Sequence, residues 1–248
     1  MSATEKRVRG LFSNFSETAF SKDGGVFSVK KASLEDAPSL ASLYAAVAVT
    51  AENADERLSD GGENSFSQVG GMFVVPTESE LEGLISDGEE FLTVSRDGVP
   101  FALMRAASEV SPPGRFEGTP PGAYAASGKV VEGGEIIVLR GRLREAAPLL
   151  FYLTLNALAE KGFLYHVGEV YRVTSYDDGR GKIRCDLFNR RSFCRMLKTG
   201  AVYIGDGPEK TVFARGLSAV VRPSLVCWEV PSSAKSLGKT LSESGIEI

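Results

Sequence analysis

The chain has 248 residues, of which 43% are hydrophobic and 24% charged, so it has enough apolar material for a folded core and lacks the composition of a disordered protein. Its net charge of −4 argues against general nucleic-acid binding, and the absence of any run of eighteen apolar residues argues against a membrane-spanning helix. Three cysteines and one histidine match no zinc-binding pattern, and the first residues lack the apolar core of a signal peptide. We therefore expect a cytoplasmic protein with reduced thiols and no metal site.

The sequence predicts one main domain with polar ends. The expected division is an N-terminal arm, a main domain and a polar C-terminal tail, over residues 1–25, 26–230 and 231–248. The domain opens with an alternating strand over residues 26–30. Ser33 then stands where a helix start is expected, with two acidic residues in the first turn and an apolar face continuing to Val47.

Two short-range signals follow in the first half of the chain. Thr77 with Glu80 three residues later is a capping-box pattern, which predicts the start of a helix. Asp97-Gly98 lies between two apolar runs and predicts the turn of a β-hairpin. The next segment, residues 107–133, contains two Pro-Pro pairs and several glycines, so we expect a long connection without regular structure.

Residues 134–163 combine a strand, a basic bend and a long helix. Residues 135–139 form a short β-branched run that predicts a buried strand, whereas residues 148–161 are apolar for long enough to make three turns of helix. A proline in the first turn and Gly162 at the end suit the two ends of that helix. The bend carries Arg140, Arg142 and Arg144 beside the free N–H groups of the helix start, which is the outline of an anion-binding site.

The remaining elements follow from apolar alternation and length. A strand is expected over residues 165–175 and a short helix over residues 189–197. Further strands are expected over residues 201–204, 211–221 and 225–230. His166, the only histidine, lies on an alternating strand, where a structural or surface residue is expected rather than a catalytic one.

The charges are unevenly distributed. Residues 51–90 contain eleven Asp or Glu and one Arg, whereas residues 180–198 contain seven Arg or Lys and one Asp. A solvated surface is the simpler interpretation of both runs. The alternative is that the acidic run attracts a cationic ligand and the basic run an anionic one.

The strand, bend and helix of residues 134–163 resemble the GNAT superfamily of acyltransferases. In that family a central strand bonds the pantetheine arm of acyl-coenzyme A, and an Arg/Gln-x-x-Gly-x-Gly/Ala loop holds the pyrophosphate at a helix start. Counting back from Gly162 places Arg142, Glu145 and Ala147 on the three motif positions, with Glu145 in place of a glycine. The resemblance implies that acetyl-CoA is the acyl donor and that it is bound by Ile137, Val138, Arg142, Arg144, Ala146 and Ala147.

A second segment, beginning at Asn189, resembles the family motif Asn-x-x-Ser/Ala-hydrophobic-x-x-Tyr-x-Lys-x-Gly-Phe. In the family the Asn bonds the coenzyme arm and the Tyr hydroxyl protonates the departing thiolate. Asn189 and Ser192 match, and the resemblance implies that both contact the coenzyme. Met196 stands at the tyrosine position, and a thioether cannot donate a proton. The acid would then be Tyr203, Tyr171 or water.

A general base is also required, because an amine must lose a proton before it attacks a thioester. A carboxylate in a partly dry cleft suits that role. Glu135 is the first candidate, since it begins the central strand, where some relatives carry such a glutamate. The alternative is that Glu135 is only a solvated strand end, and Glu169 on the next strand is the second candidate.

The expected fold is α+β, with a GNAT-like mixed, mostly antiparallel central sheet, splayed between its two central strands, and helices on both faces. The expected function is transfer of an acetyl group to a small-molecule amine or peptide, with a cationic amine preferred because of the acidic N-terminal half. The alternative is a catalytically inactive relative that binds a ligand or partner, favoured by Glu145 and Met196. Residues 107–133 are expected to serve acceptor specificity or contact a second copy in a homodimer.

Overall fold

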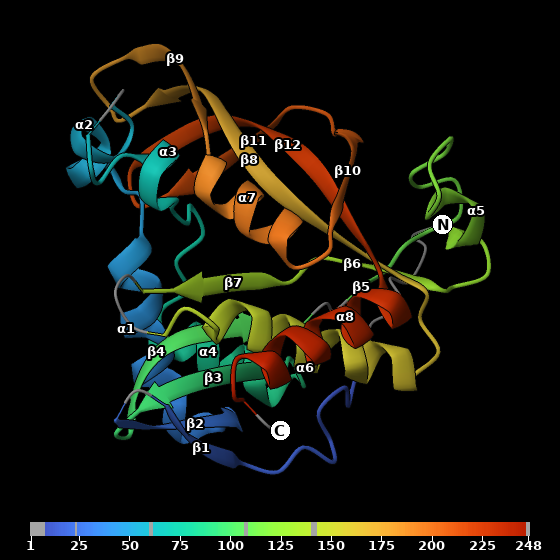
Figure 1. Ribbon diagram of the computed structural model, residues 1–248. Helices are drawn as coiled ribbons and strands as arrows, with labels where there is room; N and C mark the ends of the chain where they lie inside the picture. The colour runs from blue at the N-terminus through green and yellow to red at the C-terminus, as the bar shows by residue number, and fades with distance from the viewer. Residues whose placement is uncertain (1–7, 23, 60–61, 107–108, 140–142, 247–248) are drawn as a thin grey trace.

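The computed structural model of the protein describes residues 8–22, 24–59, 62–106, 109–139 and 143–246. Its strands form two sheets (Figure 1). The first has five strands, all antiparallel to their neighbours. Their order is β1 (Thr18–Lys22), β2 (Gly25–Lys31), β3 (Phe91–Arg96), β4 (Val99–Arg105) and β7 (Glu135–Val138).

The second sheet has seven strands. Their order is β10 (Val202–Asp206), β12 (Leu217–Glu229), β8 (Tyr165–Asp177), β6 (Val130–Glu132) and β5 (Glu109–Val110), with β11 (Lys210–Ala214) paired to β12 and β9 (Lys182–Phe188) paired to β8. All pairs are antiparallel except β6 with β8, which is parallel. The expected mixed, mostly antiparallel arrangement is thus confirmed.

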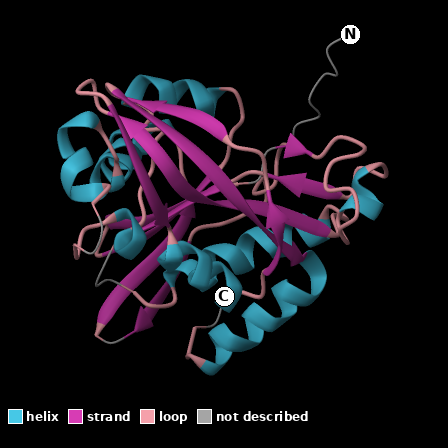
Figure 2. Cartoon of the chain, turned by 90° about the horizontal axis from the view of Figure 1, so that it is seen from above, coloured by secondary structure: helices cyan, strands magenta, loops and turns pink. Residues whose placement is uncertain are grey.

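Helices flank the strands on both sides (Figure 2). The longer ones are α1 (Ala37–Val47), α4 (Glu78–Ser86), α6 (Ala146–Glu160), α7 (Arg190–Lys198) and α8 (Val230–Glu243). Single turns occur at α2 (Ala54–Arg57), α3 (Phe66–Val69) and α5 (Gly122–Ala125), and 3₁₀ turns at Leu34–Asp36 and Ala51–Asn53. Across the described ranges, every helix is too short or too polar to cross a bilayer.

One stretch, residues 130–138, contributes a strand to each sheet. β6 pairs with β8, and two residues later β7 pairs with β4. The change of direction falls at Gly133 and Gly134, whose φ angles of +91° and +95° suit glycine. The Gly133 N–H donates to the carbonyl of Val167 at 3.2 Å. Beyond this bond the described parts of β7 and β8 share no backbone hydrogen bond, so the expected splay between the central strands is confirmed.

The main core lies where α6 and α8 pack against each other and against the sheets. Trp228 is fully buried there, with its ring stacked on Phe151 at 4.8 Å and on His166 at 5.0 Å between centroids. The indole N–H of Trp228 donates to Thr199 Oγ1 at 3.1 Å. His166 is therefore a core residue, which is the structural one of the two expected alternatives.

The short-range signals are confirmed. The Glu80 N–H donates to Thr77 Oγ1 at 3.3 Å, and the Glu80 carboxylate accepts from the Thr77 N–H at 2.7 Å, which completes the capping box of α4. Asp97 and Gly98 have φ angles of 51° and 79°, as the tight hairpin between β3 and β4 requires.

Several expected elements differ from the structure. Residues 211–221 form parts of two strands, because Arg215 and Gly216 adopt positive φ and turn the chain between β11 and β12. The expected strand over residues 225–230 is the continuation of β12. Residues 107–133, expected to be irregular, contain β5, α5 and β6.

Regular structure also occurs in both expected polar ends. Strand β1 lies within residues 1–25, and α8 occupies most of residues 231–248. The buried residues of α8 recur at helical spacing (Val230, Ala234, Leu237 and Leu241), which buries one face of an otherwise polar segment. The division into arm, domain and tail stays a prediction.

Candidate functional site

A cleft of about 460 Å³ lies between β7 and β8, a size typical of small-molecule sites. Strand β7 lines one side, and β8 with α7 lines the other. Further lining comes from the segment 66–74, which includes α3, and from two residues of β11. The remaining lining residues are Val47, Arg105, Glu109, Arg115, Glu132, Gly133, Gly134 and Leu225. Figure 1 shows β7 crossing the middle of the molecule with β4 below it and α7 above it. The cleft therefore occupies the splay between the sheets.

The backbone of β7 is available on its cleft side. β7 is the edge strand of its sheet, because it pairs with β4 alone among the described strands. Ile137 is buried, while Ile136 and Val138 are partly buried. An edge strand can bond an extended ligand through its N–H and C=O groups as it would another strand. Ile137 and Val138, expected to bind the coenzyme arm, are placed for such contacts.

Glu135 is held at the start of β7 by two residues from other elements. The Tyr44 hydroxyl donates to its Oε2, and Arg105 Nη1 lies 3.8 Å from its Oε1. Arg105 also donates from Nε to Glu89 at 3.2 Å. Burial, and then the charge of Glu135, raises the pKa of Tyr44 well above its usual value, so the hydroxyl keeps its proton. Glu135 therefore has a fixed position at the cleft.

Sequence reasoning missed both partners of Glu135. Tyr44 has the spacing of an ordinary apolar position in α1, and Arg105 ends a hairpin strand. The only sequence signal is that each is a polar-tipped residue at an otherwise apolar position. Their contact with Glu135 requires the packing of α1 and β4 against β7.

Helix α7 presents one row of side chains to the cleft. Asn189, Ser192, Arg195 and Met196 all line it, at spacings that share a helix face. Asn189 Oδ1 accepts a hydrogen bond from the Ser192 N–H at 3.0 Å and so caps the helix. A Cβ added at Gly70 would lie 2.9 Å from Asn189 Nδ2, so only glycine allows this close approach. Met196 gives this wall an apolar group without a proton donor.

The proposed phosphate-binding bend is only partly described. Arg140 and Arg142 lie outside the described residues. Arg144 is exposed, and Ala146 and Ala147 are buried in the first turn of α6; none of these three lines the cleft between β7 and β8. The helix begins two residues before the expected Pro148 and ends at Glu160, and Gly162 follows it in the expected left-handed conformation, with φ of +77°.

Glu145 is paired with Lys22 of β1. Lys22 Nζ lies 2.9 Å from Glu145 Oε1 and also donates to the Ser244 carbonyl at 2.8 Å. Both charged side chains are 17% exposed. The negative charge at the position of the family glycine is therefore compensated by a lysine from another part of the chain.

The remaining acid and base candidates lie on the β8 side. Lys210 Nζ bonds Glu169 Oε2 at 2.6 Å and sits 4.9 Å from the ring centre of Tyr171, and all three residues line the cleft. Burial raises the pKa of Tyr171. Tyr203 is half exposed on β10, packs against Phe193 and is absent from the cleft lining. The structure thus brings together Glu135, Ile137, Val138, Asn189 and Ser192, but not Tyr203.

Within the part of the chain that the structure describes, no three His, Cys, Asp or Glu side chains gather to hold a metal ion.

Comparison with known proteins shows the fold. No family model matches the sequence, and no curated protein does. Among solved structures, smu.2055 from Streptococcus mutans UA159 has a TM-score of 0.50 at 12% identity, covering 82% of this chain and 98% of its own. An N-acetyltransferase from Staphylococcus aureus Mu50 has 0.46 at 14% identity, covering 82% and 98%. Salmonella typhimurium yncA, solved with acetyl-CoA, has 0.45 at 9% identity, covering 82% and 94%.

The chain has a GNAT-like fold. The splayed strands, the mostly antiparallel pairing and the helices on both faces match the expected architecture, and the likeness to smu.2055 at a TM-score of 0.50 agrees with it. At these identities the likeness concerns the fold alone, so the chemistry must be argued from the residues of the cleft.

Proposed function

We propose that this protein transfers an acetyl group from acetyl-CoA to an amine. The observation that carries the proposal is the open edge of β7, which faces β8 across a cleft of about 460 Å³. An extended amide-containing arm can bond to that edge, which fixes the position of its reacting end. The yncA structure contains acetyl-CoA, which makes this thioester the first donor to test.

The coenzyme would be held from three sides. Ile137 and Val138 supply backbone bonds, and Asn189 and Ser192 face them from α7. The phosphates are assigned to Arg142, Arg144 and the first amides of α6, at Ala146 and Ala147, where the helix dipole favours an anion. Because Lys22 compensates Glu145, the carboxylate adds less repulsion there than its position suggests.

The transfer step requires a general base but little assistance from a general acid. Glu135 takes a proton from the amine, whose nitrogen then attacks the thioester carbonyl; the C–N bond forms and the C–S bond breaks. A thiol has a pKa near 8.5, so the leaving thiolate needs little assistance. Tyr171, which lines the cleft, or water protonates the thiolate and takes in return the second proton, which the nitrogen loses as the amide forms. Tyr203 lies away from this lining, which makes Tyr171 the better of the two tyrosines.

A cationic acceptor gains no support from the acidic run of the sequence. None of the described acidic residues between 51 and 90 lines the cleft, and residues 66–74 line it with uncharged side chains only. Several of the acids serve the fold instead: Asp55 pairs with Arg180, Glu80 caps α4, and Glu90 binds Lys31. A preference for a cationic amine must come from the carboxylates that line the cleft, which are Glu109, Glu132, Glu135 and Glu169.

The binding step is tested by thermal unfolding with acetyl-CoA. A ligand at a hundred times its Kd stabilises the native state by about 2.7 kcal/mol, so an increase of several degrees in Tm is expected. Arg142→Glu should abolish that increase and leave the Tm of the free protein unchanged. A wild-type Tm that does not move at millimolar acetyl-CoA contradicts the proposal.

The second candidate is a binding domain without turnover, favoured by Met196 at the cleft wall. Release of free thiol from acetyl-CoA in the presence of a panel of amines separates the two. Binding without thiol release above the buffer rate supports the inactive domain. Thiol release that disappears in Glu135→Gln supports the acetyltransferase.

A further inference from the structure

Arg195 is a half-buried residue of α7 whose side chain lines the cleft beside Met196. Within the described residues it makes no hydrogen bond or ion pair with a carboxylate. The charged neighbour that acts on it is Arg191, one turn earlier on the same helix. Arg195 therefore faces the cleft with a like charge behind it.

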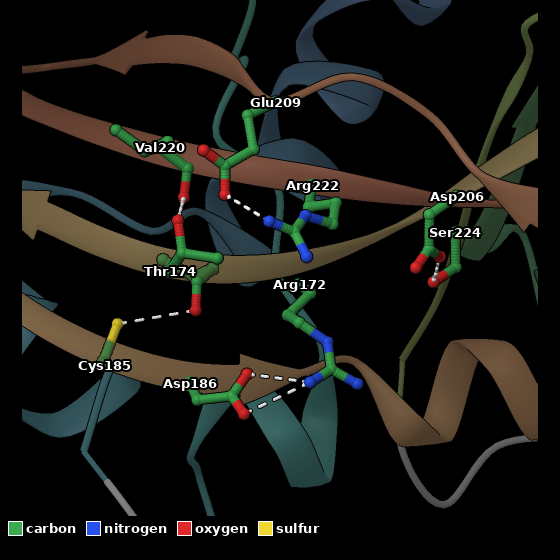
Figure 3. Close-up of polar contacts among 10 residues, drawn as sticks. Arg172, Thr174, Cys185, Asp186, Asp206, Glu209, Val220, Arg222 and Ser224 are labelled. Atoms are coloured by element: carbon green, nitrogen blue, oxygen red, sulfur yellow. Dashed lines mark hydrogen bonds and ion pairs between the residues drawn. The ribbon is translucent and has the colours of Figure 1, made fainter.

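Every other cationic side chain that lines the cleft in the described ranges has an acidic partner. Arg105 bonds Glu89 at 3.2 Å, Arg115 bonds Glu132 at 3.1 Å and Lys210 bonds Glu169 at 2.6 Å. Arginines on the neighbouring strands are also paired: Figure 3 shows Arg172 with Asp186 and Arg222 with Glu209, both at 3.0 Å.

Two further carboxylates line the cleft: Glu135, which is bonded by Tyr44 and lies near Arg105, and Glu109 of β5, which is exposed and so already hydrated. Arg195 is less exposed to water than Glu109. Burial, and then the charge of Arg191, lowers the pKa of the Arg195 guanidinium. A partly dehydrated cation without a counter-charge lowers the stability of the folded protein. Such unfavourable groups are concentrated at binding sites, where a ligand offsets their cost.

We propose that Arg195 binds a carboxylate or phosphate group of the ligand that occupies the cleft. A guanidinium can donate two parallel hydrogen bonds to either group, which makes arginine well suited to such anions. The assignment of the ligand rests on the proposed function, under which the anion belongs either to the amine acceptor or to the coenzyme. Arg195 lies six residues from Asn189, about 9 Å along the helix. The two possible sources of the anion can be distinguished by which ligand, the coenzyme or the acceptor, loses affinity when Arg195 is substituted.

The first test asks whether Arg195 has a structural role. Arg195→Met keeps most of the aliphatic stem and removes the charge, Arg195→Lys keeps the charge, and Arg190→Met removes an exposed arginine of the same helix that does not line the cleft. Without ligand, the Tm of Arg195→Met should equal or exceed that of wild type. A Tm below that of Arg190→Met would reveal a structural partner and overturn the proposal.

The second test measures binding by calorimetry. One arm compares coenzyme A, dephospho-coenzyme A and pantetheine. The other arm uses protein preincubated with coenzyme A and compares phosphoethanolamine with ethanolamine, and amino acids with their amides. Arg195→Met should weaken binding of an anionic probe about tenfold or more and leave its neutral counterpart unchanged, since hydrogen bonds to charged groups are worth about 1.5–3 kcal/mol. Arg195→Lys should lose less, and Arg190→Met should match wild type.

Each outcome has a defined meaning. A loss confined to the coenzyme arm assigns the anion to a coenzyme phosphate, and a loss confined to the amine arm assigns it to the acceptor. Equal affinities of wild type and Arg195→Met for every probe overturn the inference. If wild type binds an anionic amine through Arg195 but no coenzyme, the proposed function fails and the anion site remains.

Discussion

At the scale of single residues, His166 makes stability depend on pH. The buried imidazole stacks on the Trp228 ring. The imidazole Nε2 lies 2.9 Å from the Gly133 carbonyl oxygen. Burial lowers the pKa of His166 from 6.5 to about 4. The unfolded chain therefore binds a proton below about pH 6.5, whereas the folded chain does so only near pH 4. Stability is fully present above pH 6.5 and falls as the pH decreases toward 4, by about 1.4 kcal/mol per pH unit.

The measurement is the free energy of unfolding between pH 7 and pH 4 for wild type and His166→Gln. Carboxylates titrate in the same range, but they are shared by both proteins and their effect cancels in the difference. Wild type should lose stability more steeply than the variant. Parallel curves would show that the histidine is protonated equally in both states.

At the scale of elements, Glu90 binds the backbone of residues 11–12 next to the five-stranded sheet. Its carboxylate, 6% exposed, accepts hydrogen bonds from the backbone N–H groups of Leu11 and Phe12 and pairs with Lys31 Nζ at 2.6 Å. Glu90→Gln removes the charge while keeping the shape. We expect a loss of about 2–3 kcal/mol in the free energy of unfolding, because removing the charge weakens both backbone hydrogen bonds and the ion pair with Lys31 at once.

Denaturant unfolding measures this loss, and limited proteolysis should show earlier cleavage before β1. Glu82→Gln is the matched control, since Glu82 is exposed on α4. Unfolding of both variants at the same denaturant concentration would mean that Glu90 contributes no more than a surface carboxylate.

At the scale of the whole molecule, Lys22 joins three distant parts of the chain. It contacts Glu145 at the start of α6 and the carbonyl of Ser244 after α8, from a strand near the N-terminus. A double-mutant cycle with Lys22→Met and Glu145→Gln should give a coupling energy of about 1 kcal/mol, because the pair is largely shielded from water. Strictly additive effects on the free energy of unfolding would show that the pair contributes nothing.

Much of the fold could be predicted because its signals are short-range. Thr77 and Glu80 define a helix start within four residues, and Asp97-Gly98 defines a hairpin by its backbone preferences. Arg215-Gly216 was missed because arginine is not a residue that favours positive φ. The amphipathic face of α8 was missed because serines and lysines dominate its composition.

The site was predictable only where a family motif spans neighbouring residues. Asn189 and Ser192 line the cleft where the motif places them, although their coenzyme contacts stay a prediction. The contacts of Tyr44 with Glu135 and of Lys22 with Glu145 join residues 91 and 123 positions apart. No local pattern encodes such pairs. The isolation of Arg195 is visible only once the partners of the other cleft cations are known.

The passage of residues 130–138 from one sheet to the other has a mechanical consequence. The chain passes from one sheet to the other at Gly133 and Gly134, which both have positive φ, and a Cβ at Gly133 would meet no atom within 4 Å. A side chain there would therefore act without any clash, by shifting the preferred torsion and rotating one sheet against the other. The opening available to a ligand would then narrow or widen although no other residue of the cleft wall had changed. The width of the cleft is thus expected to depend on two residues that have no side chain.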